Sequence, residues 1–219
     1  SIKKTSYYSG FSAWRGIGSS DSKNINIYLG SDSHVVCYPI NDKLETSFTG
    51  IYKTSNSVEE SWRKEGSHAE LSEDLKSYDA FLHSLFYSSK KVFRWGLYQR
   101  DKLDTFKIND ITLLGDAAHP MLPFLAQGAN MALEDAFIFG TLAKYFTNDF
   151  EKIQNYYEKL RLDRVHSIQS ASEKQAFYNH VSNPILVKVR DFLLKNTNIA
   201  LRRTKNIYNY NALNELNKI

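Results

Sequence analysis

The chain contains 219 residues, of which 42 % are hydrophobic and 14 % aromatic, so it can bury a core and is not a disordered chain. Its 28 Lys and Arg residues and 24 Asp and Glu residues give a formal charge of +4 spread along the chain, which predicts no nucleic-acid partner. Cys37 alone excludes an internal disulfide and predicts a cytoplasmic location, and no apolar run reaches the roughly 18 residues of a membrane span, so no membrane partner is expected.

Residues 7–52 alternate between apolar and polar positions with the period of two that is typical of β-strands. Phe11, Ala13 and Arg15 share one face of the first strand, while His34 and Tyr38 share one face of the third. Turn-forming residues separate the strands at hairpin length, so we expect an antiparallel meander. After the first strand, the expected strands run through residues 26–29, 34–40 and 45–52.

Residues 57–87 change to a helical pattern. Ser67 and Glu70 form a capping box ahead of an apolar helix face, and a second short helix is expected over residues 79–87. Alternation returns over residues 92–98, which predicts a strand that rejoins the sheet. A buried strand is expected next, over residues 110–114.

The C-terminal part of the chain is predicted to be helical. Helices are expected over residues 129–146, from Asp149 onward, and over residues 185–201 after an Asn-Pro cap. The tail from Arg202 is polar and weakly amphipathic, so we expect it to fray or to pack loosely.

The stretch from residue 111 to residue 136 reads ITLLGDAAHPMLPFLAQGANMALEDA and carries most of the functional signal. Gly115 and Asp116 follow the expected strand, which places a carboxylate at the edge where open α/β sheets bind ligands. Such a carboxylate can accept hydrogen bonds from ribose or ribityl hydroxyls. The alternative is that Asp116 caps the turn that follows it.

Gly128, Ala129 and Asn130 open the next helix. Glycine lets a flat ligand approach the backbone, and the free N–H groups at a helix start can hold an anionic or polar acceptor, such as the pyrimidine edge of a reduced flavin. The Asn130 side chain could add a contact. The alternative is an ordinary helix start whose alanines serve close packing.

Together these signals resemble the second FAD-binding motif of the single-component aromatic-ring hydroxylases. These are FAD-dependent monooxygenases of the p-hydroxybenzoate hydroxylase fold, and the likeness is greatest to the salicylate hydroxylase-like branch. Residues 9–16 (SGFSAWRG) resemble the family's G-x-x-A-W-R-G strand, and residues 34–39 (HVVCYP) resemble its H-x-x-x-Y-P strand. Residues 95–101 (WGLYQRD) resemble the segment that leads into the Gly-Asp strand.

The resemblance implies a partial α+β fold of this type. A substrate-binding sheet, antiparallel or mixed, would occupy residues 1–105, the second FAD-binding motif residues 106–146, and C-terminal helices residues 147–219. The family's N-terminal βαβ unit with G-x-G-x-x-G is not recognisable, because the glycines of the first strand have the wrong spacing and context. We therefore expect the chain, which begins with Ser1, to be the C-terminal portion of a family member, and the alternative is a degenerate fragment that cannot hold FAD.

The resemblance also assigns residues to the cofactor. Asp116 is implied to bond the ribityl chain of FAD, and the helix start to face the pyrimidine edge of its ring. The loop from His119 to Phe124 is implied to line the flavin and substrate side, with Pro123 against the substrate. The implied FAD-binding residues are Gly115, Asp116, Ala117, Pro120, Gly128, Ala129 and Asn130.

In family terms, NAD(P)H reduces the flavin, O2 adds at its C4a atom, and the resulting hydroperoxide hydroxylates an aromatic, hydroxybenzoate-like substrate. An ionised phenol reacts better, and His34 is the candidate catalytic base because its unperturbed pKa of about 6.5 suits proton transfer. Tyr38 shares the face of His34, and Arg15 can pair with a substrate carboxylate. The alternatives are a hydrogen-bonded strand histidine for His34 and a structural ion pair for Arg15.

Other polar residues are expected to be structural. Arg161 and Arg164 are expected to contact Glu158 along one helix face, His119 to shape its loop, and Cys37 to fill the core. The other histidines lack metal-ligand spacing, so no metal site is expected. A homodimer is compatible with the sequence, and the rival enzymatic function is a flavin hydroxylase of the same fold with a non-aromatic or quinone substrate.

Overall fold

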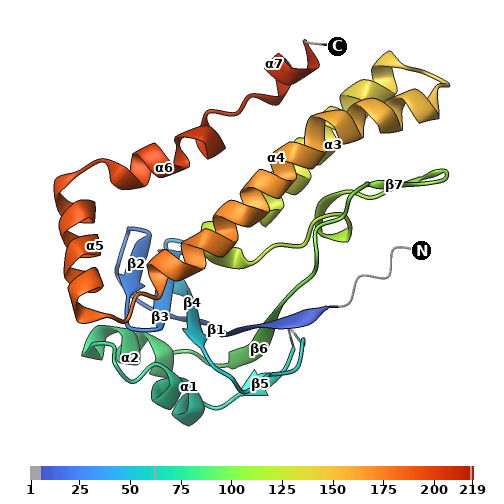
Figure 1. Cartoon of the computed structure of the whole chain (residues 1–219). Helices are drawn as coiled ribbons and strands as arrows, with labels where there is room; N and C mark the ends of the chain where they lie inside the picture. The colour runs from blue at the N-terminus through green and yellow to red at the C-terminus, as the bar shows by residue number, and fades with distance from the viewer. Residues whose placement is uncertain (1–5, 62, 218) are drawn as a thin grey trace. The chain divides into compact units, whose positions relative to one another are not determined.

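The computed structural model describes residues 6–61, 63–217 and 219. The chain divides into two compact units. The sheet unit is formed by residues 7–98 and 177–190, and the helical unit contains residues 99–176 and 191–219. Figure 1 follows the elements of both units from the N-terminus in blue to the C-terminus in red.

The sheet unit is built on six strands in the order β2-β3-β4-β1-β6-β5. The strands β2, β3 and β4 form the expected antiparallel hairpins, and β6 rejoins the sheet as predicted. The strand β1 lies on the far side of β4, where Trp14 pairs with Gly50, so the expected meander is wrong at its first strand. In chain order the strands are β1 (Tyr7–Ser19), β2 (Asn26–Leu29), β3 (Ser33–Pro39), β4 (Glu45–Lys53), β5 (Glu65–Gly66) and β6 (Val92–Gln99).

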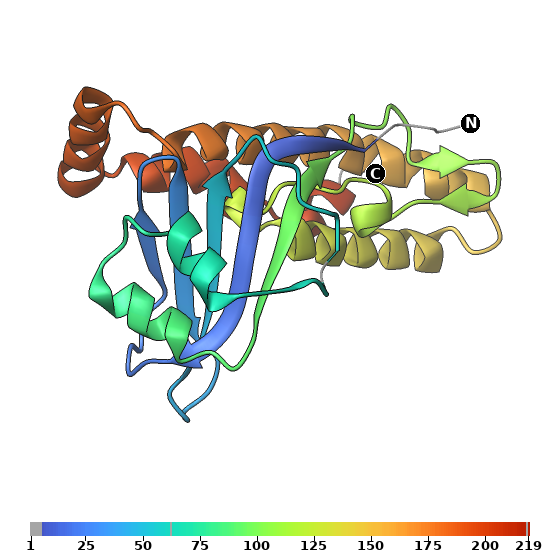
Figure 2. The same cartoon turned by 90° about the horizontal axis from the view of Figure 1, so that it is seen from below.

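Two short helices, α1 (His68–Asp74) and α2 (Ala80–Tyr87), cover one face of this sheet (Figure 2). The predicted capping box is present, because the Ser67 hydroxyl accepts from the N–H of Glu70 and the Glu70 carboxylate accepts from the N–H of Ser67. The approach of α2 to β1 is very close at Gly18. A Cβ added there would stand 2.2 Å from the carbonyl oxygen of Leu85, so this position requires glycine.

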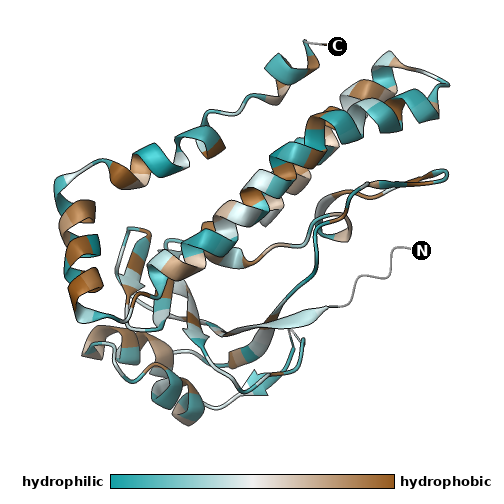
Figure 3. Ribbon diagram, viewed as in Figure 1, coloured by the Kyte–Doolittle hydropathy of each residue, from teal (hydrophilic) through white to brown (hydrophobic). Residues whose placement is uncertain are grey.

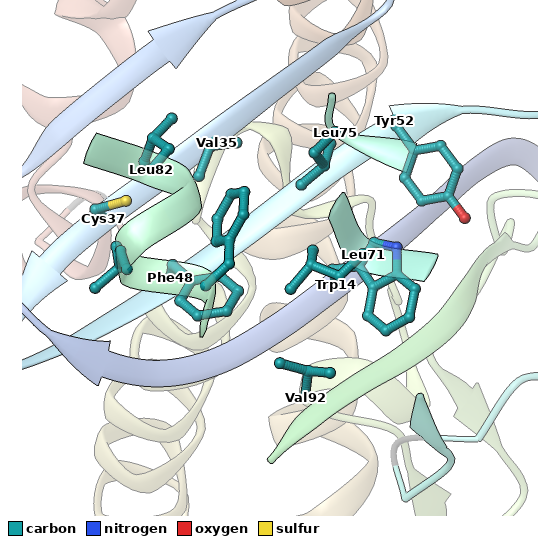
Figure 4. Packing of buried hydrophobic residues seen from close by; sticks show 11 residues of the cluster. Trp14, Val35, Cys37, Phe48, Tyr52, Leu71, Leu75, Leu82 and Val92 are labelled. Carbon is teal, nitrogen blue, oxygen red and sulfur yellow. The ribbon is translucent and has the colours of Figure 1, made fainter. Parts of the chain in front are cut away.

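The core of the sheet unit lies between these helices and the sheet (Figure 4). Trp14, Phe48 and Leu71 are fully buried in it, and each such side chain contributes roughly 1.5–3 kcal/mol through burial. Cys37 also fills this core, as predicted. Burial raises the pKa of the Cys37 thiol to about 12, so the thiol stays protonated and unreactive.

The helical unit is organised around two helices that lie side by side, α3 (Gly128–Tyr145) and α4 (Phe150–Asn179), in agreement with the predicted helices (Figure 1). Their buried faces meet through residues such as Ile138 and Tyr157. The remaining elements are β7 (Lys107–Ile108), β8 (Ile111–Thr112), the 3-10 helices η1 (Gly115–Ala117) and η2 (Pro123–Leu125), and the helices α5 (Pro184–Asn196), α6 (Ile199–Tyr208) and α7 (Ala212–Leu216).

The strand expected over residues 110–114 is wrong in length and burial. Only the two residues of β8 are in strand conformation, and they pair with β7 in a hairpin. The side chain of Ile111 is 59 % exposed. The turn at Gly115 therefore follows an extended segment at the surface of the helical unit rather than a buried strand.

The C-terminal segment forms three helices, so the single helix expected over residues 185–201 is wrong. The tail from Arg202 is helical rather than frayed, and no residue described in α6 or α7 is buried, which agrees with the expected loose packing. The Thr197 hydroxyl donates to the carbonyl of Leu193 and accepts from the N–H of Ile199, and this competition with backbone hydrogen bonds separates α5 from α6. The helix α7 packs on the core of the helical unit through Ala212 and Leu216.

Figure 3 shows apolar residues along α5, and none of the residues described in this helix is buried. Among the residues that the structure describes, no helix combines the length and the apolar character that crossing a bilayer requires.

Candidate functional site

The Gly-Asp turn is fixed against the helix that follows it. Gly115 adopts a φ of +57°, which favours glycine, and a Cβ at this position would lie 3.3 Å from Cβ of Ala132 in α3. The N–H of Gly115 donates to Oδ2 of Asp135, one turn further along α3, at 2.8 Å. The turn and the start of α3 therefore hold a defined position relative to each other.

Asp135 is the centre of a fully buried polar cluster. Its carboxylate also contacts Nε2 of His119 at 2.6 Å and accepts from Nε of Arg161 at 2.7 Å. Burial alone would raise the pKa of Asp135, but hydrogen bonds from His119 and Gly115, together with the charge of Arg161, outweigh burial and lower this pKa. The carboxylate is therefore ionised and satisfied inside the helical unit.

The expected contacts of Arg161 and Arg164 with Glu158 are wrong. Arg161 is fully buried and bonds Glu134 as well as Asp135, and Arg164 bonds the same Glu134 carboxylate at 3.0 Å. Glu158 instead accepts from the backbone N–H of Phe106 at 2.7 Å. Helix periodicity placed the arginines on one face correctly, but it could not show that this face turns toward α3.

The loop between the turn and α3 is tied to α4. The carbonyl of Pro120 accepts from Nε2 of Gln169 at 3.0 Å, and the carbonyl of Leu122 accepts from Oγ of Ser172 at 2.6 Å. Pro120 is half-buried, whereas Pro123, which starts η2, is exposed. His119 lies at the base of this loop, a position suited to the predicted role of shaping it.

The N-terminus of α3 is open. Gln127 precedes the helix, and its side chain does not cap the first N–H groups, since its Oε1 atom accepts from Nδ2 of Asn130 instead. Oδ1 of Asp116 lies 3.9 Å from the position that a Cβ on Gly128 would occupy. Asp116, Ala117, Ala129 and Asn130 are exposed, and Gly128 is half-buried.

No other described residue hydrogen-bonds the Asp116 carboxylate, so the alternative that it caps its own turn has no support in the geometry. An exposed carboxylate thus stands beside a helix start whose N–H groups are uncapped. This pairing of acceptors and donors on an open surface suits a ligand with hydroxyls and a polar or anionic edge.

The candidate substrate residues share the sheet face that lies opposite α1 and α2. Val36, which lies between His34 and Tyr38 on that face, pairs across β3 and β4 with Thr49, and Thr49 pairs in turn with Arg15. Residues that pair directly across strands point to the same face. The structure therefore brings His34, Tyr38 and Arg15 to one surface, where Arg15 and Tyr38 are exposed.

His34 is buried on this face, with only 3 % of its surface exposed. Its Nδ1 lies 2.7 Å from Nε2 of His180, and the ring of His180 contacts that of Phe11 in a tilted arrangement with 4.9 Å between the ring centroids. Burial, with a smaller contribution from His180, lowers the pKa of His34 to about 3. The imidazole is therefore neutral at physiological pH, and this low pKa makes it a weaker base than a histidine with the unperturbed pKa of about 6.5.

Arg15 also lines a pocket of about 600 Å³ in the sheet unit. Lys90 and Lys91 add positive charge to this pocket, and Phe93 and Trp95 add aromatic surface. Neither His34 nor Tyr38 lines it. Glu45 adds a negative charge to the same pocket, and the pocket is separate from the candidate base.

Asp135 and His180 were missed in the sequence. A signal for Asp135 exists, because it occupies a core position of α3 in the series Met131, Asp135, Ile138, Leu142, where a carboxylate needs buried partners. His180 lies 146 residues from His34, and no local pattern connects the two.

Residues 11–172 match the family described as FAD binding domain. The chain belongs to this family. The FAD-binding family assignment agrees with the residues at the start of α3, where the exposed Asp116 and the uncapped N–H groups fit the ribityl hydroxyls and the polar ring edge of such a cofactor.

The relatives of the chain include hydroxybenzoate monooxygenases. The 3-amino-4-hydroxybenzoate 2-monooxygenase PtmB3 of Streptomyces platensis is 28 % identical over 191 residues, which cover 84 % of the chain and 48 % of that protein. The 3-hydroxybenzoate 6-hydroxylase of Polaromonas naphthalenivorans (strain CJ2) is 29 % identical over 155 residues, or 71 % of the chain and 38 % of that protein. The chain spans about half the length of the curated relatives it matches.

Solved structures confirm the fold. A salicylate hydroxylase substrate complex superimposes with a TM-score of 0.77 at 22 % identity, covering 98 % of the chain and 57 % of that protein. Klebsiella pneumoniae HpxO, complexed with FAD and uric acid, gives a TM-score of 0.77 at 20 % identity, covering 98 % of the chain and 55 % of that protein. The α+β fold with its antiparallel sheet and C-terminal helices is thus the partial p-hydroxybenzoate hydroxylase fold predicted from the sequence.

Proposed function

We propose that this chain is part of an FAD-dependent monooxygenase that hydroxylates an aromatic, hydroxybenzoate-like substrate with NAD(P)H and O2. The observation that carries the proposal is the open surface at the start of α3, where the Asp116 carboxylate has no hydrogen-bond partner among the described residues. The family match and the aromatic monooxygenases among the relatives support it.

On the cofactor side, the Asp116 carboxylate would accept hydrogen bonds from the ribityl hydroxyls of FAD, and the N–H groups of Gly128, Ala129 and Asn130 would hold its pyrimidine edge. Bound FAD would supply the oxygen-activating chemistry. Gly115 holds the turn through Asp135, and Ala117 and Pro120 complete the surface next to the flavin.

On the substrate side, neutral His34 accepts the proton of the substrate phenol, since an ionised phenol is the better nucleophile. Tyr38 lies on the same sheet face, Arg15 pairs with a carboxylate, and Pro123 contacts the substrate from its loop. We also propose that residues 1–105, 106–146 and 147–219 act as the substrate-binding sheet, the FAD motif and the C-terminal helices of a cytoplasmic enzyme that forms homodimers.

Titration of the full-length enzyme with FAD tests the role of Asp116, and titration of the purified 219-residue chain tests whether this chain holds FAD by itself. Loss of a hydrogen bond to a charged group costs roughly 1.5–3 kcal/mol, so Asp116→Ala should weaken FAD binding about tenfold or more. Asp110→Ala is the matched control, because it removes an exposed carboxylate that precedes β8. Equal FAD affinities for the two variants would show that Asp116 does not bind the cofactor. A wild-type chain that binds no FAD would favour the alternative of a degenerate fragment.

Product analysis tests the reaction. Incubation of the full-length enzyme with NAD(P)H and hydroxybenzoates should yield a ring-hydroxylated product. The second candidate, a hydroxylase of a different substrate class, is favoured by the fold likeness to a protein complexed with uric acid. This second candidate would be supported if the enzyme consumed NAD(P)H without forming a hydroxylated benzoate but converted a purine or a quinone.

A further inference from the structure

The hydrogen bond between His34 and His180 has a chemical consequence for the proposed base. Both rings are buried, and they come from distant parts of the chain, His34 from β3 and His180 from the residue after α4. Burial keeps both imidazoles neutral, because it lowers the pKa of His34 to about 3 and that of His180 to about 4. A hydrogen bond between two neutral imidazoles contains one proton, which belongs to one of the two nitrogens.

The position of that proton decides what His34 can do. If Nδ1 of His34 carries it, Nε2 of His34 has a lone pair and can accept a proton from a substrate. If Nε2 of His180 carries it, Nδ1 of His34 is the acceptor and Nε2 of His34 is an N–H donor, which cannot act as a base.

Only in the first arrangement does the hydrogen bond between the two histidines persist after His34 has accepted a proton. Once Nε2 of His34 has accepted a proton, its Nδ1–H still donates to the lone pair on Nε2 of His180. In the second arrangement, the second proton would turn His34 into a cation that faces an N–H donor, which is repulsive. The charged groups that act on His180 are Asp32, which favours a positive charge there, and Lys53, which opposes it.

We propose that His180 is a positioning residue that fixes His34 in the tautomer with Nδ1 protonated and Nε2 free of hydrogen. Phe11 holds His180 in place through ring contact at 4.9 Å. The role of His34 as a base rests on the proposed function. The tautomer of His34 does not, because it can be measured in the chain without cofactor or substrate.

Nitrogen-15 spectroscopy of the histidine rings tests the tautomer directly. In the ¹⁵N-histidine-labelled 219-residue chain without FAD, long-range ¹H–¹⁵N correlations should show His34 in one tautomer, protonated at Nδ1. His180→Phe keeps an aromatic ring against Phe11 but removes the acceptor, so His34 should become a mixture of tautomers. In His180→Gln the amide oxygen can accept from Nδ1–H of His34, so the single tautomer should be preserved. This variant keeps the inference testable if His180→Phe does not fold.

Kinetics on the full-length enzyme loaded with FAD give the second readout. His180→Phe should lower kcat roughly 10- to 100-fold with little change in KM and should move the acid limb of the pH profile, while His180→Gln restores most of kcat. An Nε2-protonated His34 in the wild-type chain, or an unchanged tautomer in His180→Phe, would overturn the inference. Failure of the enzyme to hydroxylate any phenol would reject the proposed function and leave the spectroscopic result standing.

Discussion

Asp135 shows how much one residue can determine in this site. It lies in the same stretch of sequence as the Gly-Asp turn, but its side chain points into the helical unit. There its carboxylate forms hydrogen bonds with Gly115, His119 and Arg161. A charge in such a position is tolerated only while all of its partners are present. The exposed surface proposed to bind FAD therefore depends on a carboxylate that is itself fully buried.

We predict that Asp135→Asn lowers the free energy of unfolding by about 3–5 kcal/mol, because it leaves the guanidinium of Arg161 buried with less countercharge. Urea denaturation measures this loss. The double variant Asp135→Leu/Arg161→Met should recover part of it, since no unpaired charge remains. Glu73→Gln, which breaks the exposed pair with Lys76, is the control and should leave the midpoint unchanged. A normal midpoint for Asp135→Asn would show that the cluster does not stabilise the fold.

At this scale, the sequence predicted residues whose signal is local. Asp116 and Gly128 could be proposed as cofactor residues because turn and helix-start chemistry appear within a few neighbouring residues of the sequence. Arg161 was misplaced, since periodicity gives a helix face but not the element that covers it. His180 could not be found at all, because its partner lies on another element and only tertiary folding brings the two rings together.

At the scale of elements, glycine sets how closely helix and sheet approach. Substitutions at Gly18 in β1 and at Gly140 in α3 test this effect of glycine on packing, because the first position is crowded and the second is open. A Cβ on Gly18 would meet the backbone oxygen of Leu85 at 2.2 Å, whereas nothing lies within 4 Å of a Cβ on Gly140.

Gly18→Ala should therefore destabilise the chain by about 1–3 kcal/mol, because α2 must shift away from the sheet. Gly140→Ala should stabilise it by roughly 0.5–1 kcal/mol through the higher helix propensity of alanine. Thermal unfolding of the two variants beside wild type measures both signs. Equal shifts in the same direction would contradict the packing described for α2.

Elements with strong periodicity were predicted well from the sequence, and their partners less well. The capping box at Ser67 and the starts of α3 and α4 follow from local rules. The pairing of β1 with β4 rather than β2 is set by long-range register, which hairpin-length turns do not encode. The break between α5 and α6 depends on the Thr197 hydroxyl, which forms hydrogen bonds with backbone groups before and after it. Helix propensity alone does not predict these bonds.

At the scale of the whole molecule, the proposed site residues divide between the two units. The proposed FAD-binding residues and Pro123 belong to the helical unit, and Arg15, His34 and Tyr38 belong to the sheet unit. Chain order alone could not predict that residues 177–190 return to the sheet unit, and this return is what supplies His180.

The buried histidine pair also makes the stability of the chain sensitive to acid. In the unfolded chain both rings titrate near the ordinary pKa of about 6.5, whereas in the folded chain they titrate near 3 and 4. The unfolded state thus binds more protons over this interval, so stability should fall by a few kcal/mol as the pH drops from about 6.5 toward 3.

Urea midpoints at pH 7.5 and pH 4.5 test this expectation. The wild-type chain should lose more stability between the two values than the double variant His34→Gln/His180→Gln, which has no ring to protonate. Equal losses in both proteins would assign the acid sensitivity to other groups.

The bond from Gly115 to Asp135 has a further consequence for the proposed binding of FAD. Because it joins the turn to the helix start in the absence of any ligand, the surface is already shaped before the encounter. Little ordering entropy is then lost on association, and affinity is limited by the contacts themselves. Complex formation should accordingly follow a single kinetic step, without the slow second phase that a folding loop would introduce.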